Sequence, residues 1–520
     1  MFGYILSAVV SFLLLSYFII WPVVQYLRDP KGLRKYPNLN FVSGISNLSF
    51  CYEAHKGFRS HALLEAHQKS PVVRIGPNSL SYSDLSAIKD IYGHNTKCVK
   101  DVFYDVLAGS HHHLADVRDK LDHQRKRRIL SSAYALKNLE GWEHKVADKT
   151  ARFIKAADDH CTEPLKKGMV PAPEDLAFDY RAWANFFTLD AIADIGLSER
   201  LGFLDQGHDL VTAETIDGKL YQVNYRECLH ATARAQSGLV WSYEWFPVLS
   251  KISYLVSKHY RKMWKLNKDW DAIVYHRAKK RLARYRAGEP LDDFFSALLA
   301  DKNGSPNGME WGEIIAEVSI MMNAGSDTTA IAMNNAMYLL LANPTSLAKL
   351  RAELDAVLEP SEVVAPYDKV RHLPYLRACI DEALRMYPPT TFGLPRRTPP
   401  EGAAILGDFI PGETSVSISA YVAHRDPKVF PEPEEYRPER WLGDDARELQ
   451  AAFITFSTGA RGCIGRNISY LEQTVLLASV VHRFEWSLPY EGWVPERRES
   501  FNLMPGPMPL KVWRRFGDKD

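Results

Sequence analysis

The sequence predicts a mainly α protein with a smaller β part, an α+β fold, behind an apolar N-terminal helix. Residues 116–358 are dominated by long stretches in which apolar residues recur at helical spacing. Residues 71–83 and the Pro- and Gly-rich region after Pro388 are typical of short strands and loops. Because no Pro/Gly/Ser-rich linker divides residues 40–520, we expect one large unit there.

The N-terminal segment is predicted to cross a membrane. Residues 1–27 carry no charged side chain, and their apolar run is long enough for a hydrocarbon layer of ~30 Å. A cleaved signal peptide would place basic residues ahead of a shorter apolar core. Here Arg28 and Lys31 follow the apolar run instead. We therefore expect residues 1–27 to be a retained signal anchor, with the rest of the chain on the cytosolic side.

Beyond the anchor we expect a stiff linker over residues 28–40 and a catalytic domain over residues 41–520. A second apolar segment, Leu239–Leu249, is too short to cross a membrane. Two interpretations of it stay open. It either belongs to the core or forms a surface patch that dips into the membrane interface, where Trp and Tyr are favoured.

Charge and cysteine content narrow the function classes. The 64 Lys+Arg and 63 Asp+Glu nearly cancel, so bulk electrostatics gives no case for a nucleic-acid partner. Six scattered cysteines without a CxxC pair are not typical of a disulfide scaffold, and a reducing compartment fits best. Five of them are interpreted as inert. The sixth, Cys463, stands in an unusual setting.

That setting is the stretch Phe456–Gly465, FSTGARGCIG. Cys463 directly precedes a helix expected over residues 464–484, whose N-terminal N–H groups and dipole stabilise a thiolate. Three glycines let the backbone turn tightly and approach a flat ligand, and Arg461 adds a cation. These features favour a reactive or metal-binding cysteine.

The pattern F-x-x-G-x-R-x-C-x-G resembles the haem-binding loop of cytochromes P450, and all five specified positions match. The resemblance implies the P450 fold, haem b as the cofactor and Cys463 as the thiolate ligand of the iron. It also implies which side chains contact the cofactor. These are Cys463, Arg461, Arg396, Phe456 and the pair His123 and Arg127, where His123 replaces the Trp of many relatives.

Two further motifs carry the resemblance. Glu382 and Arg385 form an E-x-x-R motif, and Arg440 in the later stretch YRPERW is its expected partner. The family more often has Phe where Trp441 stands. The stretch AGSDTT, residues 324–329, lies in a helix expected over 311–342 and resembles the oxygen-activation motif. The resemblance implies that Asp327 and Thr328 are catalytic and deliver protons to bound oxygen.

The implied activity is that of a membrane-bound monooxygenase that inserts one oxygen atom from O2 into an apolar or aromatic small molecule. The stretches at 393–403 and 420–427 resemble fungal P450s of the benzoate para-hydroxylase and phenol/cresol hydroxylase kind, in aromatic-compound oxidation or secondary metabolism. Expected pocket walls by family position are residues 107–113, Met321, Met322, Ala324 and residues 391–394. Three alternatives stay open: a haem-thiolate isomerase or ring-expansion enzyme, a non-catalytic haem sensor, and an anchored interaction protein without cofactor.

Electrons must come from a partner, because the chain contains no flavin or nicotinamide fingerprint. The resemblance implies NADPH-cytochrome P450 reductase, with cytochrome b5 as a further donor, at the endoplasmic reticulum membrane. The basic residues Arg125, Lys126 and Arg128, together with Arg466, are expected to form the cationic docking face.

Overall fold

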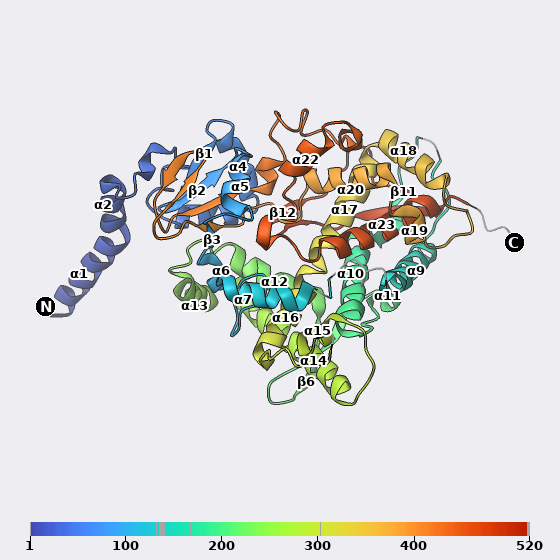
Figure 1. Cartoon of the computed structure of the whole chain (residues 1–520), viewed down its shortest axis with the longest axis horizontal. Coiled ribbons are helices and arrows are strands. Elements are labelled where there is room, and N and C mark those ends of the chain that lie inside the picture. Colours follow the sequence, from blue (N-terminus) through green and yellow to red (C-terminus); the bar gives the residue numbers. More distant parts are fainter. Residues whose placement is uncertain (1, 132, 135–140, 167, 302, 517–520) are drawn as a thin grey trace.

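The structure is a computed structural model that describes residues 2–131, 133–134, 141–166, 168–301 and 303–516. About 53% of the chain is helical and 11% lies in strands, which confirms the predicted mainly α class with a smaller β part. In Figure 1 the N-terminal helix extends from one end of the molecule, the main sheet lies next to it, and the long helices fill the remainder.

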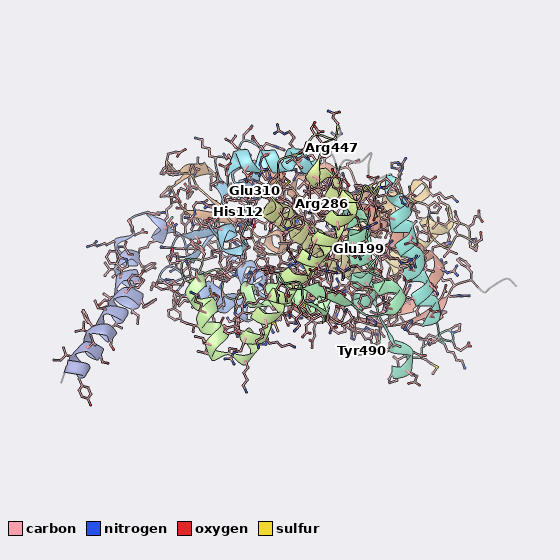
Figure 2. All side chains as sticks on the ribbon, turned by 90° about the horizontal axis from the view of Figure 1, so that it is seen from below. His112, Glu199, Arg286, Glu310, Arg447 and Tyr490 are labelled. Atoms are coloured by element: carbon pink, nitrogen blue, oxygen red, sulfur yellow. The ribbon has the colours of Figure 1, made fainter. Side chains whose placement is uncertain are left out.

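The N-terminal helix consists of three consecutive pieces, α1 (Phe2–Leu15), η1 (Ser16–Ile20) and α2 (Trp21–Arg28). Among the described residues it is the one helix, Tyr4–Arg28, long and apolar enough to cross a membrane, with a mean hydropathy of 2.1. Asp29 ends it in the left-handed region, at φ 46°. The helix projects away from the body in both views (Figures 1 and 2), as expected for an anchor.

The segment expected to be a linker is packed against the sheet. Lys31 Nζ donates hydrogen bonds to Asn78 Oδ1 at 2.9 Å and to the Gly412 carbonyl at 2.7 Å. Leu33 is 2% exposed, and the backbone of residues 37–39 bonds to Arg74. The N-terminal helix is therefore joined to the body through fixed contacts.

The main sheet has the strand order β1-β2-β10-β7-β3. Its strands are β1 (Val72–Gly76), β2 (Ser79–Tyr82), β3 (Val99–Lys100), β7 (Arg396–Arg397) and β10 (Ser415–Ile418). β2 and β10 are parallel and the other pairs are antiparallel, and Lys100 stands opposite Arg396 in the β3–β7 pair. The remaining strands are β4 (Phe178–Asp179), β5 (Leu210–Glu214), β6 (Leu220–Asn224), β8 (Ala403–Ile405), β9 (Asp408–Ile410), β11 (Phe484–Ser487), β12 (Arg497–Glu499), β13 (Leu503–Pro505) and β14 (Pro509–Arg514).

The long helices form a layer that shares one large apolar core, reaching from Leu114 to Val512. They are α7 (Lys120–Ser131), α9 (Glu143–Asp159), α10 (Tyr180–Leu197), α12 (Tyr225–Ser237), α14 (Lys258–Arg286), α16 (Trp311–Ala324), α17 (Asp327–Ala342), α18 (Pro344–Asp355), α20 (Pro374–Met386) and α23 (Arg466–Arg483). The shorter ones are α3 (Leu48–His55), α4 (Arg59–His67), α5 (Ala87–Tyr92), α6 (Phe103–Leu107), α11 (Phe203–Gln206), α13 (Phe246–Val256), α15 (Phe294–Leu299), α19 (Tyr367–Val370), α21 (Ala420–Ala423) and α22 (Ala446–Ala452), with 3-10 turns at η2 (Leu33–Lys35), η3 (Pro173–Leu176), η4 (Pro438–Leu442) and η5 (Gly459–Arg461).

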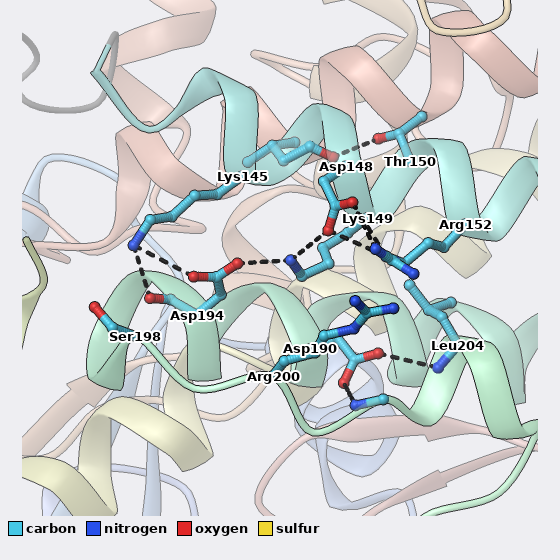
Figure 3. Close-up of polar contacts among 12 residues, drawn as sticks. Lys145, Asp148, Lys149, Thr150, Arg152, Asp190, Asp194, Ser198, Arg200 and Leu204 are labelled. Atoms are coloured by element: carbon cyan, nitrogen blue, oxygen red, sulfur yellow. Dashed lines mark hydrogen bonds and ion pairs between the residues drawn. The ribbon is translucent and has the colours of Figure 1, made fainter. Parts of the chain in front are cut away.

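Helices α9 and α10 are joined by ion pairs as well as by apolar contacts. Lys149 Nζ lies 2.6 Å from Asp194 Oδ2 and 2.7 Å from Asp148 Oδ2 (Figure 3). Asp190, one turn before Asp194 on α10, accepts the backbone N–H groups of Gly202 and of the first two residues of α11 (Figure 3). Lys149 thereby joins α9 to α10, and Asp190 joins α10 to the start of α11.

Two local expectations differ from the structure. Residues 210–224 form the β5–β6 hairpin inside the region expected to be helical. The helix expected over residues 311–342 is interrupted at Gly325 and Ser326, between α16 and α17. A Cβ on Gly325 would lie 2.7 Å from Ile192 Cδ1 and 2.8 Å from the Met321 carbonyl oxygen. Close packing of α10 against the break therefore requires glycine there.

Candidate active site

Cys463 stands at the end of the loop that begins at Phe456, just before α23. Its backbone N–H donates to the Phe456 carbonyl at 2.8 Å, which closes the loop on itself. Gly459 has φ +67°, and a Cβ there would meet the Tyr92 carbonyl oxygen at 2.1 Å. The loop therefore folds tightly only because this position is glycine.

Cys463 is exposed, whereas among the other five cysteines four are buried and Cys161 is partly buried. Desolvation by the surrounding protein nevertheless raises the pKa of the Cys463 thiol. The two observations agree if solvent can reach the thiol while protein atoms surround it on most sides. The backbone N–H groups of Gly465 and Arg466, at the start of α23, and the cation Arg127 act in the opposite direction and favour the thiolate.

Two residues of the oxygen-activation motif, Ala324 and Thr328, are accessible as well, together with Ile320 one turn before them. Ile320 and Thr328 are partly exposed and Ala324 is exposed, although the helices around them are largely buried. Their four-residue spacing places them along one face of α16 and α17. Of the pocket walls expected from the sequence, Ala324 lies on this face. Met321 and Met322 do not fit the expectation, since both belong to the buried core.

The predicted cofactor-binding cations gather in one cluster. Burial and the nearby Arg461 and Arg127 lower the pKa of His123 to about 4. Burial and Arg396 lower the pKa of Arg461 to about 10. Lys100, which the sequence analysis did not single out, acts on the same groups. We call Lys100, His123, Arg127, Arg396 and Arg461 the cation cluster.

The hydrogen bonds of the cation cluster go to neutral partners. Arg461 donates to the carbonyls of Val117 and Arg118 at 2.7 and 3.1 Å. Arg127 donates to the Gly462 carbonyl at 2.7 Å, and Arg396 donates to the Tyr104 hydroxyl at 3.3 Å.

Within the described part of the chain, no member of the cluster has a carboxylate within ion-pairing distance. Like charges at this density require an anion. The two propionates of haem b, beside a thiolate, fit this set of donors.

Asp327 and Thr328 lie next to each other but make separate contacts. Thr328 Oγ1 donates to the Ala324 carbonyl at 2.8 Å. Asp327 is 4% exposed, and its Oδ1 accepts from Arg181 at 2.8 Å, His230 at 3.1 Å and Asn185 at 3.3 Å. Although burial opposes it, His230 and Arg181 hold the pKa of Asp327 far below its usual range. Asp327 is thus a fixed anion between α17, α10 and α12.

Sequence reasoning missed Arg181, Asn185 and His230. The first two are spaced i, i+4 on a mostly apolar helix, which is a weak signal that their side chains share a buried face. His230 gives no signal without knowledge of which helices pack together.

The predicted partnership of Glu382 is confirmed. Glu382 accepts from Arg385 at 2.8 and 2.9 Å and from Arg440 at 2.9 Å, and the side chains of all three are 3% exposed or less. Trp441 adds a further bond, because its Nε1–H donates to Glu382 Oε2 at 2.9 Å. Arg385 also donates to the carbonyl of His424, whose Nε2 accepts the backbone N–H of Ile454. The network thereby supports the start of the Cys463 loop.

The expected docking face is only partly present. Lys126 is 1% exposed and its Nζ lies 2.8 Å from Glu313 Oε1. Arg125 also pairs with Glu313. The prediction that Lys126 belongs to the docking face is therefore wrong, because it is buried against carboxylates of α16, whereas Arg125 is partly exposed and already paired with Asp122 and Glu313. Arg128 and Arg466 are exposed.

Comparison with known proteins supplies the family. The family model described as Cytochrome P450 matches residues 56–512. A benzoate 4-monooxygenase from Aspergillus niger is 28% identical over 99% of both chains. A cytochrome P450 monooxygenase from Hormonema carpetanum is 32% identical over 86% of this chain and 85% of its own. A tryprostatin B 6-hydroxylase from Aspergillus fumigatus is 27% identical over 91% of this chain and 80% of its own.

The motifs, the desolvated thiol with its cation cluster, and a family match over most of the chain lead to one assignment: this chain belongs to the cytochrome P450 family and is a haem-thiolate monooxygenase with haem b as its cofactor.

Proposed function

We propose that Cys463 is the thiolate ligand of the haem iron and that Arg461, Arg396, His123 and Arg127 bind the haem propionates. The observation that carries this proposal is the accessible thiol of Cys463, desolvated by the protein around it, at the N-terminus of α23. Phe456 packs against Tyr470 with ring centroids 5.2 Å apart and so supports the loop from the side. Haem held by a thiolate supplies the electron-rich iron on which dioxygen is activated.

The ligand assignment is tested with Cys463→Ser and, as a matched control, Cys379→Ser, which alters a buried cysteine of α20. We expect Cys463→Ser to abolish both turnover and the carbon monoxide spectrum typical of reduced haem-thiolate proteins. Cys379→Ser is expected to lower stability and leave that spectrum in place. A thiolate-type spectrum in Cys463→Ser would refute the assignment.

We propose that Thr328 and Asp327 serve proton delivery in different ways. Thr328 Oγ1 is accessible on the open face, donates to the Ala324 carbonyl, and would hold a hydroxyl proton where oxygen activation by the haem would need one. Asp327 is held as an anion by Arg181 and His230, so it orients its surroundings rather than storing a proton itself. Burial lowers the pKa of His230, and the Asp327 carboxylate opposes that shift. His230 is the less buried end of this pair, with its side chain 11% exposed against 5% for Asp327.

For the substrate we propose a small aromatic molecule. Two relatives are named for the oxidation of benzoate and of tryprostatin B, and the open face of α16 and α17 presents Ile320 and Ala324 beside a lone hydroxyl, that of Thr328. Feeding benzoate, substituted phenols and indole derivatives to cells that co-express a reductase, followed by mass spectrometry, tests this class. Oxidation of long aliphatic substrates alone would contradict it.

We propose that the enzyme lies on the cytosolic face of the endoplasmic reticulum and receives electrons from NADPH-cytochrome P450 reductase, with cytochrome b5 as a second donor. The apolar N-terminal helix and the exposed cations Arg128 and Arg466 support this arrangement. A second apolar surface lies close to the anchor. On α13, Ile252, Leu255 and Val256 are 49%, 69% and 78% exposed. Trp245, just before α13, contacts Phe18 of the anchor with ring centroids 4.9 Å apart.

A further inference from the structure

Lys100 and Arg396 stand directly opposite each other in adjacent strands, in the β3–β7 pair. Side chains in this relation lie ~5 Å apart at their Cβ atoms, and like charges so placed destabilise a sheet. Both residues are buried, with 8% and 3% of their surface exposed. Burial removes the water that would otherwise screen the repulsion. The pair therefore calls for a compensating anion.

The local contacts of Lys100 do not supply a compensating anion. Its Nζ donates to the Ala115 carbonyl at 2.5 Å and lies 3.7 Å from the centroid of the Tyr104 ring. Asp116 acts on it from a greater distance and pairs with His112 and His113 instead. Burial, followed by Arg396 and Arg461, holds the pKa of Lys100 well below its usual range. The protein alone thus disfavours the charged form, which a neighbouring carboxylate would restore.

We propose that Lys100 binds a haem propionate, together with Arg396 and Arg461. The proposal rests on the proposed function, from which it takes the cofactor, and it adds a cation that the family motifs do not name. The propionate carboxylate would accept the N–H of Lys100 and neutralise the repulsion across the β3–β7 pair. Such a charge-assisted bond is stronger than the bond to the neutral Ala115 carbonyl.

The competing explanation is that Lys100 only stabilises the fold through its hydrogen bond to the Ala115 carbonyl. Such a bond would stabilise the fold equally with and without tight haem binding, and its loss would not change how long haem stays bound. A propionate contact would slow haem release itself. The rate of haem loss therefore separates the two explanations, and it needs no substrate.

The experiment follows transfer of haem from the ferric holoenzyme to excess apomyoglobin, for wild type, Lys100→Met and Lys100→Arg. The matched control is Lys149→Met, which removes another buried lysine, one that pairs with Asp194 and Asp148 (Figure 3) and lies on α9, a helix that carries no member of the cation cluster. We expect Lys100→Met to release haem about tenfold faster or more, as loss of a bond to a charged group implies. Lys100→Arg keeps the charge and is expected to restore most of the slow release.

The control Lys149→Met is expected to lower the thermal midpoint and leave haem release unchanged. Unchanged release in Lys100→Met, or equally fast release in Lys100→Met and Lys100→Arg, overturns the proposal. If Lys100→Met never loads haem, loading by Lys100→Arg supports it and failure of both overturns it. A wild-type spectrum without thiolate character would instead refute Cys463 as ligand, and the Lys100 result would still be read from the haem release.

Discussion

At the scale of single residues, buried polar side chains mark the places where function is built into the core. Asp327 illustrates this, because one carboxylate oxygen accepts bonds from three side chains on two other helices. Removing one member of such a buried set leaves the others charged and without compensation, which costs more than the set contributes when intact.

We predict that Asp327→Asn lowers the free energy of unfolding by about 3–5 kcal/mol, because Arg181 then stays buried without a counter-ion. Asp408→Asn is the control. Its pair with Lys35 is more than half exposed on both sides and should cost less than about 1 kcal/mol. Urea unfolding of the holoenzyme measures both values. Equal costs for the two variants would show that Asp327 is not held as an ion.

A second residue-scale prediction concerns Trp441, where the family more often has Phe. Trp441→Phe removes the indole N–H from Glu382 while it keeps most of the ring packing. Since the acceptor is a buried carboxylate, we expect the unfolding free energy to drop by about 1.5–3 kcal/mol. Trp493→Phe, at a partly buried surface site beside Tyr338, is the control. An unchanged unfolding midpoint in Trp441→Phe would contradict the role given to the indole.

At the scale of elements, the break between α16 and α17 decides how closely α10 can approach the active site. We predict that Gly325→Ala lowers the unfolding free energy by about 1–3 kcal/mol, since the added Cβ overlaps with Ile192. Combining it with Ile192→Ala should recover part of this cost, so that the double variant is less destabilised than the sum of the single variants. If the losses in unfolding free energy of the two single variants simply add in the double variant, there is no steric clash between the two positions.

The loop over residues 107–118 is clamped to the first half of the same interrupted helix. The Leu114 N–H donates to Glu317 Oε1 at 2.9 Å, and the His111 ring lies directly over Gly312. His111 also lies near Glu310, which is labelled together with the neighbouring His112 in Figure 2. Because Ala324 and Thr328 continue this helix, the clamp holds the loop beside the open face.

This clamp gives a pH prediction. Burial raises the pKa of Glu317 from 4.5 to about 7, although Lys126 lies 3.4 Å away. The folded state therefore binds a proton that the unfolded state releases, so this contribution is complete below pH 4.5 and is lost as the pH rises through 7. We expect wild type to lose ~3 kcal/mol of stability relative to Glu317→Gln across that window. Thermal midpoints at several pH values measure it, and parallel curves for the two proteins would contradict it.

Local sequence patterns predicted the elements near the active site better than they predicted which side chains contact one another. The Cys463 loop, the Glu382 motif and the strands around residue 75 all have short-range signals: fixed spacings, turn glycines and alternation. The β5–β6 hairpin and the contacts of Asp327 depend on which helices pack together, which no single stretch encodes. Lys126 was misjudged for the same reason, since a basic run on α7 became buried once α16 supplied Glu313 and Glu317.

At the scale of the whole molecule, two apolar surfaces lie at one end, the N-terminal helix and α13. We predict that a chain lacking residues 1–28 stays partly bound to microsomes in high salt, because the exposed side chains of α13 still enter the interface. Adding Leu255→Glu and Val256→Glu should release it. Fractionation by centrifugation measures this. Complete release of the truncated chain without the extra substitutions would show that α13 does not contact lipid.

The cation cluster also has a consequence for how much of this protein a cell contains. Burial and neighbouring cations hold the pKa values of Lys100, His123 and Arg461 below their usual ranges, and this unfavourable crowding of basic groups makes the chain an easier target for proteases until a dianionic ligand binds. Ligand binding to the native state alone shifts the balance by mass action. The steady-state amount of enzyme should therefore rise and fall with porphyrin supply, even when its transcript is constant.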